Sequence, residues 1–277
     1  MSFINHNGKL VPPTRPLYTA DNRGYRYGDG LFETMKVVNG KIQLAAFHFE
    51  RLWEGLELME ANIPALVTAE RLEKEILTLC IKNDCNDLGR VRLSLSRGNG
   101  GLYDGDDSLQ YTIEAWPLPD TIQQLNENGL VIDIYPHARK SCDRFANLKS
   151  ANFLPYVMAA RYARQHKFND CLVLNQYERV ADASIANVFL IQGDTLLTPS
   201  LTEGCVKGVM RRKLLEEAPA FGWKVKEAPI LLNDLLMADE IFLTNSTNGL
   251  RWVKNFRDKF FPQIKTRDIY QKLTQIL

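Results

Sequence analysis

Residues 25–44, "YRYGDGLFETMKVVNGKIQL", contain two short apolar runs on either side of Asn39-Gly40. An Asn-Gly pair in this position is a strong hairpin signal, because both residues tolerate the positive φ angles of a two-residue turn. Along the first run, period-two alternation places Phe32, Thr34 and Lys36 on one face of a strand. The chain is therefore expected to form an antiparallel sheet early in its sequence.

Helical and strand periodicities continue outward from this hairpin. Apolar residues recur at helical spacing over residues 45–61 and again over residues 68–80, where Thr68 is the expected cap. The segments "RVRLSLS" and "YTIEAWPL" predict two strands that complete the first half. The second half predicts a strand at 130–135, a helix at 155–167, the strands "CLVLNQ" and "NVFLIQGDTLLTP", and a helix after Gly208.

A polar, proline-containing segment at residues 118–129 is expected to link two domains. Residues 1–117 then form a small α/β domain, and residues 130–277 form a larger, strand-rich domain. The whole chain is expected to have a mixed α/β (α+β) fold with a sizeable core, since 45% of its 277 residues are hydrophobic.

Composition narrows the class of protein. Basic and acidic residues nearly balance, 34 against 33, without a long run of either sign, so neither a nucleic acid nor a membrane surface is an expected partner. The five cysteines never form a CxxC pair and the four histidines show no metal spacing, which predicts reduced thiols and no metal site. The N-terminus lacks a signal-like apolar run, so the expected location is the cytoplasm.

Four separated stretches carry a family resemblance. They are residues 25–44, "FHFERL" at 47–52, "RFANLKSANFLPY" at 144–156, and a series running from "VADASIANVFLI" through "TPSLTEGCVKGVMR" to "EIFLTNSTNG". In this order and at these intervals they resemble the class IV, fold-type IV pyridoxal-phosphate enzymes. That family includes branched-chain aminotransferases, D-amino-acid aminotransferases and aminodeoxychorismate lyase. The resemblance implies pyridoxal 5'-phosphate as cofactor, a strand-rich pseudo-barrel in the larger domain, and a homodimer.

By this resemblance, Lys149 forms an imine (a Schiff base) with the cofactor aldehyde and moves a proton at the substrate α-carbon. An ammonium group cannot attack an aldehyde, so the site must favour the uncharged amine. The apolar neighbours Leu148, Phe153 and Leu154 suit that requirement.

The resemblance also implies a set of contacts to the cofactor phosphate. A guanidinium offers parallel donors to phosphate oxygens, and a helix N-terminus points backbone N–H groups at an anion. Many relatives have a threonine where this chain has Met210, so only the backbone donors carry over at that position. The phosphate contacts implied by the resemblance are Arg51, Gly208, Val209, Met210, Ser246 and Thr247.

Asp182 stands where the family has a glutamate, five residues before Asn187 of the "NVF" strand. A carboxylate there keeps the pyridine nitrogen protonated, so that the ring can act as an electron sink. Aspartate preserves the charge but is one methylene shorter. Either the backbone approaches more closely, a water bridges the gap, or Glu178 takes over; Asp182 is the favoured candidate.

Residues that decide the substrate give conflicting signals. Family relatives line the substrate pocket with the positions of Phe32, Thr34 and Lys36, and either Lys36 or Arg97 could meet a carboxylate. Arg97 matches a position that branched-chain enzymes use for oxo-acid binding, whereas the motifs "FET" and "LTNSTNG" resemble those of the lyases. D-amino-acid aminotransferases and some lyases have an arginine at the position of Leu102, and its absence weakens the assignment to a D-amino acid.

Three functions follow from these residues. The favoured one is an aminotransferase acting on an amino acid and a 2-oxo acid, with Lys149 and Asp182 as catalytic residues. The alternative within the same family is 4-amino-4-deoxychorismate lyase, which releases pyruvate and forms 4-aminobenzoate. The alternative of another class is a non-catalytic protein that binds pyridoxal phosphate or another small phosphate.

Overall fold

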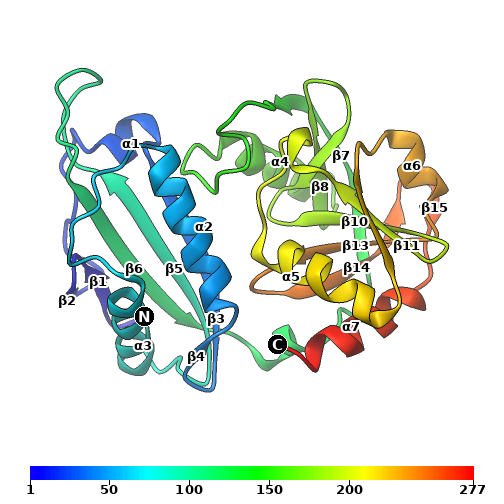
Figure 1. Cartoon of the computed structure of the whole chain (residues 1–277), viewed down its shortest axis with the longest axis horizontal. Helices are drawn as coiled ribbons and strands as arrows, with labels where there is room; N and C mark the ends of the chain where they lie inside the picture. Colours follow the sequence, from blue (N-terminus) through cyan, green and yellow to red (C-terminus); the bar gives the residue numbers. More distant parts are fainter. The chain divides into compact units, whose positions relative to one another are not determined.

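The computed structural model describes residues 1–277, which form two compact units (Figure 1). The first unit comprises residues 1–122 and 148–153, and the second comprises residues 123–147 and 154–277. The division after residue 122 falls within the segment predicted to be a linker. Residues 148–153, however, belong to the first unit and not to the larger domain, because they pair with its sheet: Phe32 N donates to Lys149 O (3.0 Å) and Ala151 N donates to Gly30 O (2.8 Å).

The first unit is built on a six-stranded antiparallel sheet with the order β2-β1-β6-β5-β3-β4. The predicted hairpin is confirmed, with Asn39 at φ 48° and Gly40 at φ 73°. The strands are β1 (Ile4–His6), β2 (Lys9–Val11), β3 (Gly30–Val38), β4 (Lys41–Ile42), β5 (Leu88–Arg97) and β6 (Leu109–Pro117).

Two helices cover one face of this sheet, and both were predicted. They are α2 (Ala45–Leu58) and α3 (Ala69–Lys82), and Thr68 caps α3 by accepting a hydrogen bond from Arg71 N. A short helix, α1 (Arg23–Tyr27), precedes β3. Leu31, Met35 and Val37 of β3 point into the core beneath α2 and α3. The alternate residues of β3 therefore lie on the opposite face of the sheet.

The second unit contains a nine-stranded mixed sheet that curls around its own core. The strand order is β12-β11-β10-β13-β14-β7-β8-β9, with β15 paired to β14. The strands are β7 (Leu130–Lys140), β8 (Asp170–Asn175), β9 (Val180–Ala183), β10 (Asn187–Gln192), β11 (Thr195–Pro199), β12 (Lys224–Ala228), β13 (Glu240–Asn245), β14 (Gly249–Phe256) and β15 (Lys259–Phe260).

The helices of the second unit are α4 (Leu154–Gln165), α5 (Val209–Glu217), α6 (Leu232–Met237) and α7 (Lys265–Thr274). The same unit contains the short 3-10 turns η2 (Leu201–Glu203) and η3 (Ala218–Phe221). A further 3-10 turn, η1 (Asp120–Gln123), lies where the chain passes from the first unit to the second. Both α4 and α5 begin where the sequence predicts. The mixed α/β fold class is confirmed, and no helix combines the length and apolar character needed to cross a membrane.

Candidate active site

Lys149 lies against aromatic rings of the first unit. Its Nζ is 4.6 Å from the centroid of the Phe32 ring and 5.8 Å from that of Phe153, and the two rings meet edge to face at 5.4 Å. Of the other apolar neighbours expected from the sequence, Leu148 packs against the core, whereas Leu154 is 65% exposed. The amine is therefore held beside aromatic faces by backbone pairing with β3.

A second cation approaches the same ring. The guanidinium carbon of Arg92, from the neighbouring strand β5, is 3.9 Å from the centroid of Phe32. Arg92 pairs in register with Thr34, so both lie on the face of the sheet that the helices leave uncovered. Its Nε donates to Ser94 Oγ (3.1 Å), and its two terminal nitrogens make no hydrogen bond in the structure. The Phe32 ring thus contacts both the Lys149 amine and the Arg92 guanidinium on the uncovered face of the sheet.

Beneath that surface, Glu33 binds two side chains of α2. Arg51 Nε donates to Glu33 Oε1 (2.8 Å), Arg51 Nη2 donates to Oε2, and His48 Nδ1 donates to Oε2 at 2.6 Å. Burial alone would raise the pKa of Glu33, but Arg51 and His48 outweigh this effect and lower that pKa to about 2. Glu33 is therefore a permanent carboxylate that orients both the arginine and the histidine.

The electrostatics of His48 link this cluster to Lys149. Burial lowers the pKa of His48, Glu33 opposes that shift, and the charges of Arg51 and Lys149 add to the lowering. His48 is therefore neutral at pH 7, with its proton on Nδ1. Its Nε2 is buried and has no hydrogen-bond partner within the chain.

The other substrate candidates also lie in the first unit. Thr34 and Lys36 follow Phe32 along the uncovered face of β3, and Lys36 is buried, which lowers the pKa of its ammonium. Arg97 instead donates to Asp29 Oδ1 (3.2 Å) and to Met59 O (2.7 Å). Arg97 therefore stabilises the end of β5, whereas Lys36 lies on the same face of the sheet as Arg92.

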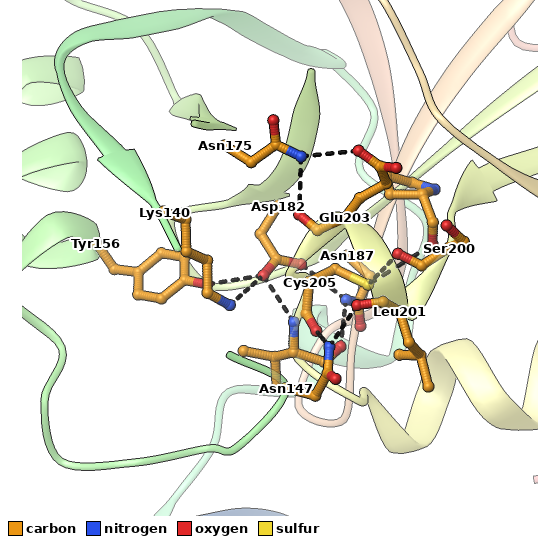
Figure 2. A network of polar contacts seen from close by, with 12 residues as sticks. Lys140, Asn147, Tyr156, Asn175, Asp182, Asn187, Ser200, Leu201, Glu203 and Cys205 are labelled. Carbon is orange, nitrogen blue, oxygen red and sulfur yellow. Dashed lines mark hydrogen bonds and ion pairs between the residues drawn. The ribbon is translucent and has the colours of Figure 1, made fainter. Parts of the chain in front are cut away.

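Asp182 is the centre of a buried network in the second unit (Figure 2). Tyr156 Oη donates to Asp182 Oδ2 (2.7 Å) and Lys140 Nζ lies 3.4 Å from the same oxygen, while Asn187 Nδ2 donates to Oδ1 (2.8 Å). The backbone N–H of Val206 donates to Oδ2 at 2.8 Å. Glu178, the alternative carboxylate, lies in an exposed turn and binds Arg139, so the structure favours Asp182 as the buried acid.

The N-terminus of α5 adjoins this network. Gly208 is its N-cap residue, and a Cβ there would collide with Asn187 Oδ1. Because glycine has no side chain to cap the helix, the first backbone N–H groups at Val209 and Met210 remain available for an anion. The side chains of Val209 and Met210 are buried, which fixes this turn against the core.

Asn187 also connects α5 to a second turn. It pairs with Thr244 on β13, immediately before residues 245–248. Asn245 Oδ1 accepts hydrogen bonds from Thr247 N (3.1 Å) and Asn248 N (2.7 Å), which fixes the backbone around Ser246 and Thr247. Asn187 therefore lies between the two turns of the second unit that carry the five expected anion-binding positions, Gly208–Met210 and Ser246–Thr247.

Comparison with known proteins decides the family. The sequence model of the family described as "Amino-transferase class IV" matches residues 30–256. The chain belongs to the class IV aminotransferase family. Enzymes of this family depend on pyridoxal phosphate (PLP), so the protein is a PLP-dependent enzyme, as the sequence predicted.

Individual relatives of this class IV enzyme differ in reaction. A D-alanine aminotransferase from Listeria monocytogenes is 29% identical over 247 residues, which cover 87% of this chain and 83% of the relative. An aminodeoxychorismate lyase from Bacillus subtilis is 30% identical over 253 residues, covering 88% and 83%. The crystal structure of 4-amino-4-deoxychorismate lyase from Pseudomonas aeruginosa matches with a TM-score of 0.84 at 28% identity and covers 99% of both chains. Both reactions predicted from the sequence are thus represented.

The residues of this class IV enzyme fit PLP on the chemistry of their donors and acceptors. The glycine-capped N-terminus of α5 has no side chain that caps its first N–H groups, so it can receive a phosphate, and Gly208 packs against Asn187 without room for a side chain. Asp182 is a buried carboxyl whose Oδ1 accepts only one hydrogen bond, so it retains capacity for a protonated ring nitrogen. Lys149 supplies the primary amine.

The sequence assigned no role to four residues that lie near these positions: Glu33, Arg92, Lys140 and Tyr156. Glu33 left a detectable signal, since it occupies a core position in the alternating pattern of β3, where a carboxylate needs a partner. Arg92 lies within the predicted strand "RVRLSLS", but alternation along a strand assigns it no role beyond a polar position. Lys140 and Tyr156 left no signal, because their contacts to Asp182 join positions 42 and 26 residues apart.

Proposed function

We propose that this enzyme is an aminotransferase that moves an amino group between an amino acid and a 2-oxo acid. The observation that supports it best is the Phe32 ring with Lys149 Nζ and the Arg92 guanidinium beside it. A substrate with a carboxylate next to its reacting carbon needs both a cation to bind the carboxylate and an amine for proton transfer.

The roles of the residues follow from their chemistry. When bound, PLP supplies the electron sink for the substrate α-carbon. Lys149 holds the cofactor through Nζ and carries the proton to and from that carbon. Asp182 provides the negative charge for the ring nitrogen. The phosphate is assigned to Arg51, Gly208, Val209, Met210, Ser246 and Thr247.

The substrate carboxylate is assigned to Arg92, with Lys36 as a second cation on the same face. Phe32 and Thr34 form the wall between these cations and Lys149. Arg97 is assigned a supporting role, because its donors already bind Asp29 and the carbonyl of Met59. Two cations on one face suit a substrate with more than one carboxylate.

A second candidate reaction is the release of pyruvate from 4-amino-4-deoxychorismate. Its support is the Pseudomonas aeruginosa lyase, which matches this chain over 99% of both lengths. That substrate also carries carboxylates, so the cationic face would serve both reactions.

One experiment separates these reactions. Protein reconstituted with PLP is given L- and D-amino acids with 2-oxo acids, and separately 4-amino-4-deoxychorismate without an amino acceptor. The aminotransferase proposal expects a new amino acid in the first assay and no 4-aminobenzoate in the second. Lys149→Ala is expected to lose the visible band of the bound cofactor and all turnover, whereas Lys41→Ala, in the exposed hairpin, keeps both. A band of undiminished strength in Lys149→Ala contradicts the assignment.

We further infer a cytoplasmic homodimer. The helix α4 exposes Leu154, Val157 and Met158 to solvent, and large exposed apolar side chains on one helix favour a partner subunit. The five free cysteines suit a reducing compartment. Sedimentation analysis tests the dimer: the wild type is expected at twice the mass of one chain, and Val157→Glu is expected to shift it toward one chain.

A further inference from the structure

The acceptor oxygens of Asp182 are unequally used. Three donors contact Oδ2: Tyr156 Oη at 2.7 Å, Val206 N at 2.8 Å and Lys140 Nζ at 3.4 Å. A single donor, Asn187 Nδ2, contacts Oδ1 at 2.8 Å. Because each carboxylate oxygen offers about two lone-pair sites, the remaining acceptor capacity lies on Oδ1.

Only one of these donors is a cation. Burial raises the pKa of Asp182, and the charge of Lys140 is the largest effect that opposes it. The other titratable groups that face Asp182 are Tyr156 and Cys205, and burial raises the pKa of both, that of Cys205 to about 12. Both are therefore neutral at pH 7. Lys140 is the counter-ion of a carboxyl group that is only 2% exposed.

The backbone of β7 directs Lys140 inward. The pairing of β7 with β8 shifts register between Ile134 and Arg139, and regular pairing then resumes at Arg139 and Lys140. After this irregularity Arg139 points outward to Glu178, so Lys140 points to the opposite face. Its side chain is 11% exposed, and its Nζ lies 5.2 Å from the centroid of the Tyr156 ring.

We propose that Lys140 is a positioning residue for the cofactor: its ammonium keeps Asp182 ionised and holds Oδ2, which leaves Oδ1 to accept the N–H of the pyridine ring. This inference rests on the proposed pairing of Asp182 with the cofactor nitrogen. A buried carboxylate that loses its only counter-ion takes up a proton, and a neutral carboxylic acid cannot stabilise a pyridinium. The negative charge of Asp182 thus depends on the ammonium group of Lys140, which β7 supplies.

The test uses the full-length protein and two readouts that do not depend on turnover. The first is the titration of Asp182 in the cofactor-free protein, followed by 13C NMR of carboxyl-labelled aspartate and assigned by the loss of its signal in Asp182→Asn. The second is the dissociation constant of PLP at pH 7.5, measured by quenching of protein fluorescence. The variants are Lys140→Met and Lys140→Gln, with Lys140→Arg to retain the charge and Arg139→Met as the matched control on the outer face.

The expected results differ between the variants. Loss of the ammonium should raise the titration midpoint of Asp182 by about one pH unit or more, since an opposite charge within 4–6 Å shifts a carboxyl group by roughly one to three units. The dissociation constant of PLP should rise about tenfold, which corresponds to about 1.4 kcal/mol. Lys140→Arg and Arg139→Met should match the wild type in both readouts.

Failure of this inference can be told apart from failure of the proposed function. If Lys140→Met and Lys140→Gln both fold, as judged by thermal unfolding, and Asp182 titrates as in the wild type, Lys140 is not its counter-ion. If neither folds, the unchanged midpoint or affinity of Lys140→Arg supports the charge role, and a raised midpoint in that charged variant overturns it. If wild-type protein binds no PLP, the cofactor assignment fails, while the Asp182 titration still decides whether Lys140 controls its charge.

Discussion

Glu33 and Arg51 form a two-pronged ion pair inside the first unit, with Arg51 Nε 2.8 Å from Glu33 Oε1 and Arg51 Nη2 bound to Oε2. The side chain of Glu33 is 2% exposed and that of Arg51 is 9% exposed, and Glu33 also binds His48. The arginine expected to bind phosphate is thus oriented by a carboxylate from the neighbouring strand.

Replacing Glu33 should destabilise the protein strongly. Glu33→Gln keeps the shape but leaves the largely buried Arg51 without its counter-ion, and breaking a buried pair in this way costs about 3–5 kcal/mol. Urea unfolding measures the change in the free energy of unfolding. Glu57→Gln lies on the exposed side of α2, the helix that carries Arg51. It should change the free energy of unfolding by less than about 0.5 kcal/mol. Equal effects of the two substitutions would show that the pair is not stabilising.

The stability contributed by Glu33 should depend on pH in one direction. Its pKa is about 2 in the folded protein against an ordinary value of 4.5. A lowered pKa stabilises the fold above the unfolded value, and that contribution is lost as the pH falls from about 4.5 to about 2. The difference in unfolding free energy between wild type and Glu33→Gln should therefore be largest at pH 7 and shrink toward pH 2. A difference that grows in acid would contradict the assigned charge state.

Arg92 should determine the affinity for the substrate carboxylate. Hydrogen bonds to charged groups contribute about 1.5–3 kcal/mol, so Arg92→Met should raise the KM for the oxo acid roughly tenfold or more while kcat changes little. Arg71→Met, on α3 beneath the other face of the sheet, serves as the control. Steady-state kinetics with varied oxo acid measures both constants. A KM unaffected by Arg92→Met would move the carboxylate to another cation, with Lys36→Met as the next variant.

Gly208 should not tolerate a side chain. A Cβ at this position collides with Asn187 Oδ1, and Asn187 in turn holds Asp182. Gly208→Ala is expected to displace the first turn of α5 and to raise the dissociation constant of PLP about tenfold. Lys213→Ala, later in the same helix, removes only a surface ion pair with Glu217 and should leave PLP affinity unchanged. Unchanged PLP affinity in Gly208→Ala would place the phosphate elsewhere.

Local patterns predicted most of the secondary structure near the site. The Asn39-Gly40 turn, the cap at Thr68 and the glycine before α5 are each set by residues within a few positions of one another. The strands β1, β2, β9, β12, β14 and β15 and the helices α1, α6 and α7 were not predicted, and β13 was recognised only as part of a motif. Several of these elements are too short or too polar to show a clear period, and they form because partners elsewhere in the chain complete their hydrogen bonds.

The sequence by itself determined the mixed α/β class, the order of the motifs and hence the family, because turn chemistry, alternation and motif spacing are local properties of the chain. Only the tertiary structure decided that residues 148–153 pair with the first sheet. The tertiary structure likewise decided that Arg92, and not Arg97, lies against the same Phe32 ring as Lys149. It also decided that Lys140 faces Asp182. Burial and charge pairing depend on contacts between segments that are far apart in the sequence, and local sequence patterns do not specify those contacts.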